Sequence, residues 1–100
     1  MAEVRLSPAA RRDFLKIGDD TRDHRSEVQA ERYLRQILDM IAEIGRHPLS
    51  GSAIDWLRSD YRRRRAGSHL IFYVILNDVM VEVVRILHER SDVSRHLGPS

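Results

Sequence analysis

Two short apolar runs near the end of the chain give its clearest pattern of hydrophobic and polar positions. Ser68 to Leu76 and Val79 to Leu87 are rich in Val, Ile, Phe and Tyr, and only Asn77-Asp78 separates them. β-branched and aromatic residues favour strands, and a polar pair of this kind is typical of a tight turn. The pattern therefore predicts a β-hairpin.

A third strand is expected before this hairpin, from Trp56 to Arg64. Four consecutive arginines, Arg62 to Arg65, precede Ala66-Gly67, where the glycine can adopt a positive φ and let the chain reverse. Because the segment has little apolar surface and much charge, we expect it at an edge of the sheet, where charge discourages unwanted pairing.

The beginning of the chain predicts a strand and then a helix. Glu3 to Leu6 alternates charged and apolar residues, and Ser7-Pro8 offers a capping hydroxyl and a proline suited to a first helical turn. The helix is expected to end near Ile17, with Gly18 as its stop and Asp13 facing outward.

A second and longer helix is predicted after a polar loop from Asp19 to Arg25. Ser26 to Gln29 matches a capping box, and Gly45 followed by His47-Pro48 ends the helical pattern. Its apolar residues recur at helical spacing: Tyr33, Leu34, Ile37, Leu38, Met40, Ile41 and Ile44. This periodicity is typical of a helix with one buried face.

The remaining segments complete an α+β fold. Arg46 to Asp55 is predicted as a surface connection, Ser91 to Leu97 as a last helical turn, and residues 98–100 as a frayed tail. The order is strand, helix, helix and three strands, or β-α-α-β-β-β. We therefore expect one domain over residues 1–97, with a two-helix layer packed on one face of a mainly antiparallel sheet.

Charge is the compositional feature that adds most to this picture. The chain has 42% hydrophobic and 32% charged residues, an ordinary globular balance. Its net charge of +2 is uneven, because the residues through Asp55 carry −1 and those from Trp56 onward carry +3. Lys16 is the only lysine, and arginine favours forked contacts with carboxylates or phosphates. An acidic protein or a nucleic acid would suit the hairpin half.

Several functional classes are excluded or disfavoured by the sequence. The chain has no cysteine, so it can form neither a disulfide nor a thiolate metal site. His88-Glu89 resembles the start of a zinc-protease motif, but Asp92 stands where the second histidine would be. No apolar run approaches the roughly 20 residues of a membrane span, and the first residues lack the pattern of a secretion signal. We expect a cytoplasmic protein without metal, cofactor or membrane contact.

Five segments in order resemble the ParE branch of the ParE/RelE family of bacterial toxins. They are VRLSPAA (residues 4–10), AERYLRQI (30–37), HPLSG (47–51), GSHLIFYVI (67–75) and VVRILHERSDVSRHL (83–97). The last segment most favours ParE over RelE. Leu70 and Ser91 depart from the family, which often carries a basic residue and a methionine there.

The resemblance implies a non-catalytic toxin of a type II toxin–antitoxin system that inhibits DNA gyrase. It also implies neutralisation by a ParD-like antitoxin, through which alone the toxin reaches operator DNA. The residues predicted to bind the target are Arg85, His88, Glu89, Arg90 and Asp92. Those predicted to bind the antitoxin are Leu34, Leu38, Arg62 and Arg64, where a disordered antitoxin tail would fold onto exposed apolar side chains.

An alternative function is a ribosome-dependent mRNA endoribonuclease, as in the RelE branch. Metal-free RNA cleavage needs a base, an acid and a cation for the phosphate, which His88, Tyr61 and Arg85 could supply. Arg85 and His88 are three residues apart on one strand, so they point to opposite faces unless a bulge intervenes. A third possibility is an inactive toxin that survives as a binding or regulatory module.

Overall fold

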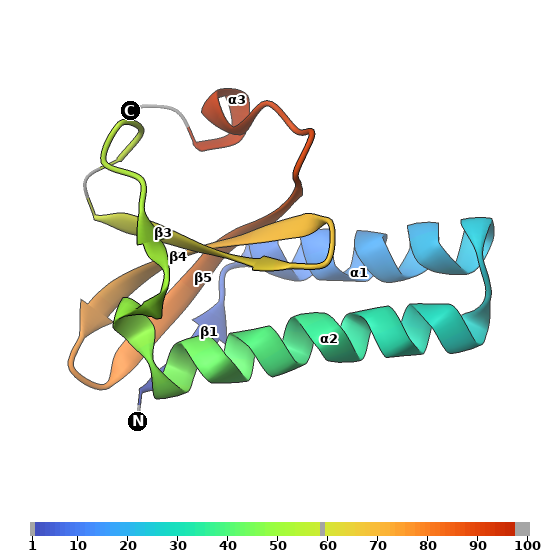
Figure 1. Ribbon diagram of the computed structural model, residues 1–100, viewed down its shortest axis with the longest axis horizontal. Coiled ribbons are helices and arrows are strands. Elements are labelled where there is room, and N and C mark those ends of the chain that lie inside the picture. Colours follow the sequence, from blue (N-terminus) through green and yellow to red (C-terminus); the bar gives the residue numbers. More distant parts are fainter. Residues whose placement is uncertain (1, 59, 98–100) are drawn as a thin grey trace.

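The computed structural model describes residues 2–58 and 60–97, and it confirms the α+β fold (Figure 1). The elements are β1 (Glu3–Leu6), α1 (Pro8–His24), α2 (Glu27–Arg46), the 3-10 turn η1 (Pro48–Ser50), β2 (Ser52–Ala53), β3 (Tyr61–Ala66), β4 (His69–Asn77), β5 (Met80–His88) and α3 (Val93–Leu97). The sheet order is β1-β5-β4-β3-β2, in which β1 is parallel to β5 and the other neighbours are antiparallel.

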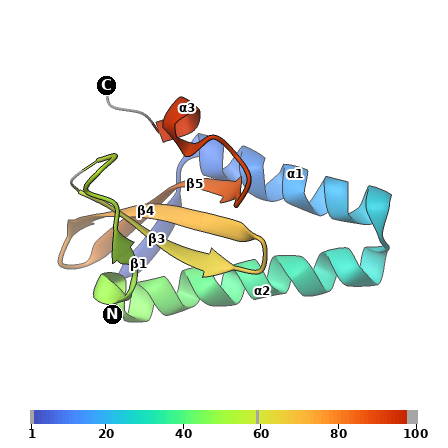
Figure 2. The same cartoon turned by 45° about the horizontal axis from the view of Figure 1, so that its top comes forward.

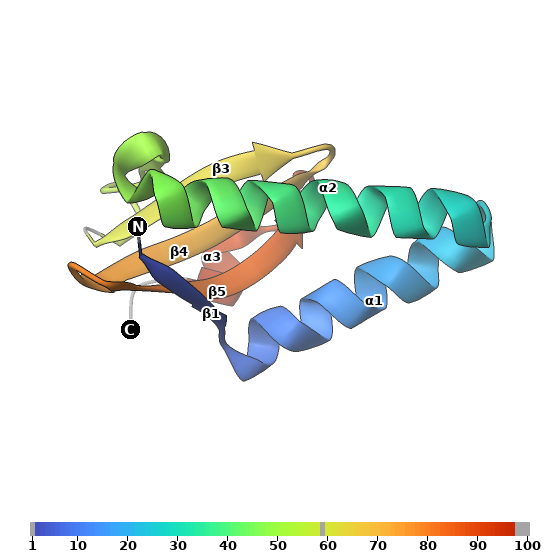
Figure 3. The same cartoon turned by 90° about the horizontal axis from the view of Figure 1, so that it is seen from below.

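The helices lie on both sides of this sheet, but very unequally. α1 and α2 form a hairpin along one face, with α2 across β3 and β4 and α1 beside β1 and β5, and its tip extends past the strands (Figure 3). The short α3 lies on the other side (Figure 2). We call the side under α1 and α2 the covered face and the side under α3 the open face. Among the described residues, no helix is long and apolar enough to cross a membrane.

Apolar side chains are buried on both faces. The cluster on the covered face includes Ile37, Ile44, Ile71, Tyr73, Val81 and Val83. The cluster on the open face is Ile54, Leu57, Leu70, Phe72, Leu87 and Leu97. Leu97 belongs to α3, which ends at this residue, as the sequence predicts for the last helical turn. The predicted frayed tail, residues 98–100, lies outside the described residues.

The first helix is longer than the sequence predicts. α1 continues past Gly18 to His24, so the predictions of a stop at Gly18 and of a loop from Asp19 to Arg25 are wrong. Gly18 is buried, and a Cβ there would lie 3.0 Å from Leu34 Cδ1 of α2. The absence of a side chain at Gly18 therefore lets α1 and α2 approach each other. A glycine inside a helix lowers its stability by less than an interruption of the helix would.

The second helix begins and ends close to its predicted limits. Ser26 Oγ accepts a hydrogen bond from Gln29 N at 3.1 Å, which confirms the serine half of the predicted capping box. α2 continues one residue past Gly45, and His47-Pro48 then ends it. A Cβ on Gly45 would lie 2.9 Å from Val4 Cγ2, so this glycine allows β1 to pack against the helix end.

The segment before β3 differs most from the prediction. β3 begins at Tyr61, not at Trp56, because residues 55–57 form a turn. Ile54 and Leu57 both pack into the open-face cluster, whereas residues three apart in a strand point to opposite faces. The connection from Arg46 to Asp55 is also only partly a surface loop, since it contains η1, the buried Gly51 and β2. The prediction that β3 lies at an edge of the sheet is also wrong, because β2 is the outermost strand, although it pairs only with Arg62 and Arg63.

The hairpin of β4 and β5 is confirmed, with its turn one residue later than predicted. Asn77 pairs with Met80, so Asp78-Val79 forms the turn, and Asn77 Oδ1 accepts a hydrogen bond from Val79 N at 2.9 Å. Gly67 has a φ of 60°, as the β3–β4 turn requires. A Cβ on Gly67 would lie 2.5 Å from Tyr33 Cε1, so both the backbone and α2 demand glycine there.

Candidate functional site

α1 packs against the outer edge of β5. This edge contains Arg85, one of the predicted target-binding residues. The register shifts where Tyr73 pairs with Val83 but Phe72 pairs with Arg85, so Val84 is the extra residue of a bulge. Beyond the end of β1, Ser7 donates to β5 twice: its N–H to Val83 O and its hydroxyl to Val84 O. These bonds satisfy strand groups that no neighbouring strand reaches.

Arg85 is held at this edge by a two-pronged ion pair with Asp13. Arg85 Nε lies 2.7 Å from Asp13 Oδ2 and Arg85 Nη2 lies 2.9 Å from Oδ1, while Oδ2 also accepts from Ile86 N. The hydrogen bond to Asp13 raises the pKa of Arg85, so the guanidinium stays charged. The prediction that Asp13 faces outward is wrong, because this side of α1 lies against β5 and its side chain is only 14% exposed.

His88 lies in a different environment from Arg85. The register from Arg85 to His88 is regular, so the two side chains point to opposite faces, with His88 on the covered side opposite His69. The His69 and His88 rings pack edge to face at a centroid distance of 5.3 Å. Both line a cavity of about 500 Å³ between the β3–β4 turn and the ends of α1 and α2.

Tyr33 anchors this histidine pair to α2. Its hydroxyl lies 2.5 Å from His69 Nδ1 and accepts from Ser68 N at 3.0 Å. The same hydroxyl lies 3.3 Å from Ala66 O, to which it donates, and 3.2 Å from Ser68 Oγ, so Tyr33 ties α2 to the β3–β4 turn. Burial, and then the neighbouring His88, lower the pKa of His69.

The charged end of β5 carries the other predicted target-binding residues. Glu89, Arg90 and Asp92 are all exposed in the connection to α3. Glu89 forms an ion pair with Arg65, and this hydrogen bond lowers the pKa of the carboxyl group. Arg90 N donates to His88 Nδ1 at 3.1 Å, so this end of β5 has a defined turn. The structure brings these residues together but leaves Arg85 apart from His88.

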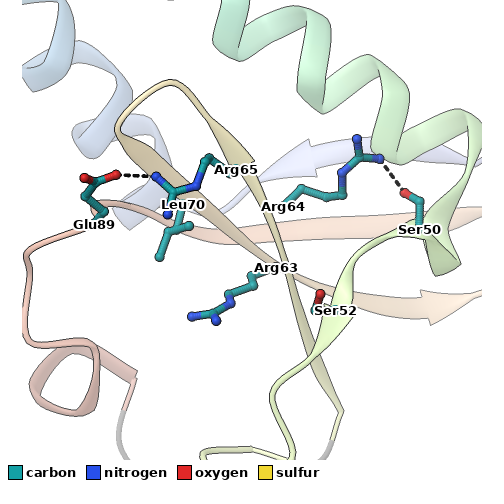
Figure 4. Close-up of a pocket in the computed structure, with 7 residues that line it drawn as sticks. All are labelled: Ser50, Ser52, Arg63, Arg64, Arg65, Leu70 and Glu89. Atoms are coloured by element: carbon teal, nitrogen blue, oxygen red, sulfur yellow. Dashed lines mark hydrogen bonds and ion pairs between the residues drawn. The ribbon is translucent and has the colours of Figure 1, made fainter.

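Alternation along β3 divides the arginine run between the two faces. Arg62 donates to Gly51 O at 2.7 Å, and Arg64 donates to Ser50 Oγ at 2.7 Å. These two guanidinium groups are therefore already bound to the η1 segment. Arg63 and Arg65 point the other way, toward the open face (Figure 4).

Arg63 and Arg65 line a concavity of about 400 Å³ on the open face. Ser52 lies directly across from Arg63 in the register, Leu70 lies across from Arg65, and Glu89 closes one side (Figure 4). Ser50 and Arg64, already bound to each other, also line this concavity. We call Arg63, Arg65, Ser52, Leu70 and Glu89 the arginine pocket. Its donors outnumber its acceptors, so its chemistry suits an anion.

The predicted antitoxin-binding residues lie on two separate surfaces. Leu34 and Leu38 line a groove of about 690 Å³ on the outside of the helical hairpin, together with Phe14 of α1 and Val28 of α2. Leu38 is 48% exposed and Val28 is 61% exposed. Arg62 and Arg64 lie instead at the β3 edge beside η1, so the structure does not place the four residues on one continuous surface.

The three residues of a ribonuclease do not converge. Tyr61 lies on the open face, where the Arg58 guanidinium stacks 4.8 Å from the centre of its ring. Arg85 is bound to Asp13 and His88 lies on the covered side. Within residues 2–58 and 60–97, no group of three or more His, Asp or Glu side chains could hold a metal ion.

Comparison with known proteins gives the family. The model of the family described as "ParE toxin of type II toxin-antitoxin system, parDE" matches residues 4–93. The chain belongs to the ParE toxin family. Toxin ParE1 of Mycobacterium tuberculosis is 42% identical over 92 residues, covering 92% of this chain and 94% of the relative. Toxin ParE1 of Caulobacter vibrioides is 36% identical over 98 residues, covering 98% of this chain and all of the relative.

Solved structures agree with the ParE fold. A chain from a structure described as a chromosomal ParDE toxin–antitoxin system of P. aeruginosa superposes with a TM-score of 0.76 at 12% identity, covering 88% of this chain and 96% of that one. A chain of the toxin–antitoxin complex RelBE2 of Mycobacterium tuberculosis gives a TM-score of 0.67 at 23% identity, covering 87% and 96%. This chain therefore shares its fold with both solved chains.

Sequence reasoning missed three residues that shape these ParE surfaces. Helical periodicity predicts that Asp13 faces solvent, because it cannot show that a strand edge lies beside α1. The sequence gives no signal for Ser52, since β2 has only two residues. Periodicity places Tyr33 in the core, but it cannot show that the turn at Gly67 brings His69 within reach of the Tyr33 hydroxyl.

Proposed function

We propose that this ParE-family chain is a bacterial cytoplasmic toxin that inhibits DNA gyrase and is neutralised by a ParD-like antitoxin. The observation that carries the proposal is the match to the ParE family over residues 4–93. The separation of Arg85 from His88 supports a toxin that acts by binding, since the groups for RNA cleavage are not assembled. The relatives compared above are bacterial proteins.

The antitoxin surface in this proposal is the groove on the helical hairpin. Leu38 and Val28 are exposed apolar side chains on α2, beside Leu34 and Phe14. An amphipathic segment of the antitoxin would remove them from water and fold as it binds. Arg32 and Arg35 also line this groove and would pair with acidic residues of the antitoxin. Operator DNA would be reached only through the antitoxin.

The target surface in this proposal is the charged end of β5. His88, Glu89, Arg90 and Asp92 are exposed together where the chain leaves the sheet. Arg85 contributes by fixing β5 to α1 through Asp13, so its substitution would act on the shape of this surface.

A supercoiling assay tests the proposed target. Purified toxin should block supercoiling by gyrase, the cognate ParD-like antitoxin should restore it, and mRNA in a parallel translation reaction should stay intact. Normal supercoiling at saturating toxin would contradict gyrase inhibition. Cleavage of mRNA in the ribosomal A site, abolished by His88→Ala, would replace the proposal with the ribonuclease function.

A matched pair of variants tests the proposed antitoxin surface. Leu38→Glu places a charge in the groove and should weaken antitoxin binding at least about tenfold, because it removes apolar contact and puts a carboxylate where the antitoxin's apolar side chains would pack. Val79→Glu makes the same change at the hairpin turn, where Val79 is 64% exposed, and should leave binding unchanged. Equal affinities for the two variants, measured by calorimetry, would move the antitoxin surface elsewhere.

A further inference from the structure

The arginine pocket on the open face contains cationic donors that the protein itself does not use. Arg63 is partly buried, yet its guanidinium makes no hydrogen bond or ion pair with any described residue. The hydroxyl of Ser52 across from it is also without a side-chain hydrogen bond in the part of the chain that the structure describes. One guanidinium carries five N–H donors, so Arg63 and Ser52 can together donate several hydrogen bonds to one anion.

Glu89 is the carboxylate that partly neutralises the pocket. It binds Arg65 from the end of β5, leaving Arg63 and Ser52 without an acceptor (Figure 4). Both partners are substantially exposed, with side-chain exposures of 58% for Arg65 and 37% for Glu89. An ion pair this exposed is weak, so an incoming anion can replace Glu89 at Arg65.

From this arrangement we propose that the arginine pocket binds the phosphodiester backbone of a single-stranded nucleic acid. Guanidinium forks match phosphate oxygens, and serine hydroxyls are common phosphate donors. Arg63 and Arg65 are two residues apart on one face of β3, or about 6.7 Å. That separation lets them bind successive phosphates of an extended strand.

The loop that joins β2 to β3 favours a nucleic acid over an acidic protein segment. Both strands supply residues of the pocket, and the loop between them presents Trp56 with 67% of its surface exposed. Exposed aromatic rings beside arginines are typical of surfaces on which unpaired bases stack. An acidic peptide would use the arginines, whereas an unpaired base could also stack on the indole. The inference goes beyond gyrase inhibition and does not depend on it.

The test is direct binding by the purified full-length protein, without gyrase or antitoxin. A fluorescein-labelled single-stranded oligonucleotide of 12 thymidines would be titrated by fluorescence anisotropy at several salt concentrations. Arg63→Gln should weaken binding about tenfold, as the loss of a charged hydrogen bond does, and should reduce the salt dependence by about one phosphate contact. Arg12→Gln removes the same charge from the exposed side of α1 and should change affinity less than about twofold.

Two further measurements separate the pocket from general electrostatics. Glu89→Gln should tighten binding, because it frees Arg65, whereas Asp39→Asn removes an equal charge from α2 and should not. Trp56, the only tryptophan, should lose fluorescence on binding the oligonucleotide but not on addition of inorganic phosphate. Unchanged thermal unfolding of Arg63→Gln would show that its loss of binding is not a loss of fold.

Three outcomes would contradict the proposal. Equal losses in Arg63→Gln and Arg12→Gln would mean that only net charge attracts the strand, and would overturn the pocket. Tight binding of a glutamate-rich peptide, with none of the oligonucleotide, would assign the pocket to an acidic protein segment. Tighter binding of a duplex of the same length would overturn the single-strand preference.

Discussion

The covered and open faces of the sheet are built from the same strands but bury different amounts of apolar side chain. Twelve buried residues form the cluster under α1 and α2, and six form the cluster under α3. Because α3 has only five residues, it leaves the β3 side of the open face to Tyr61, Arg63 and Arg65. The covered face therefore contributes most of the hydrophobic core, and part of the open face remains accessible for binding.

The two faces also differ in the charged groups that they carry. No charged side chain is buried among the described residues. The margin of the covered face carries the His69–His88 pair, where burial lowers the pKa of His69, whereas Arg85 points to the opposite face and is paired with Asp13 at the edge of β5. The open face carries the guanidinium groups of Arg63 and Arg65. A substitution on the covered face should thus change stability, and one on the open face should change binding.

The largest effect is expected for Ile37→Ala on the covered face. Ile37 is fully buried, so the variant should lose about 2–5 kcal/mol of unfolding free energy through lost burial and the cavity that remains. Leu97→Ala on the open face should cost no more than the lower end of that range, because the short α3 can shift to close the gap. Urea unfolding followed by circular dichroism measures both. Equal losses would show that α3 belongs to the stable core.

Much of the covered face could be predicted from the sequence, because helical and strand periodicity report burial directly. The stripe of Ile37, Ile41 and Ile44 and the runs of β4 and β5 are in place. Periodicity failed at Gly18, where glycine has a helix-ending preference but is needed for contact between α1 and α2. A local preference was overridden there by tertiary packing.

The open face was harder to predict, because its geometry depends on short and irregular segments. The two-residue β2, the turn around Ile54 and Leu57, and the bulge at Val84 leave no periodic signal. Strand alternation did divide the arginine run correctly between the faces, as the contacts of Arg62 and Arg64 show. It could not show that Glu89 lies beside Arg65, since that contact joins β3 to the far end of β5.

A smaller effect is expected when two ion pairs, Asp13–Arg85 and Arg65–Glu89, are compared. Asp13→Asn should lower the unfolding free energy by about 1.5–3 kcal/mol, because the side chain of Arg85 is only 23% exposed and loses charged hydrogen bonds. Glu89→Gln should leave the urea midpoint unchanged, since the Arg65–Glu89 pair is open to solvent. A measurable destabilisation by Glu89→Gln would show that the open face also supports the fold.

The smallest effect is expected from the pH dependence of the His69 site. Burial and His88 lower the pKa of His69, so the folded protein binds its proton less readily than the unfolded chain does. Stability from this group is therefore complete above the unfolded pKa of about 6.5 and declines as the pH falls through that value toward the folded pKa. His69→Gln should remove this part of the decline between pH 7.5 and pH 5.5, measured as urea midpoints, whereas His47→Gln at an exposed position should keep it. If the stability of His69→Gln declined with falling pH as much as that of the unsubstituted protein, the imidazole would be as easily protonated in the folded protein as in water. The margin of the covered face would then not disfavour a charged side chain.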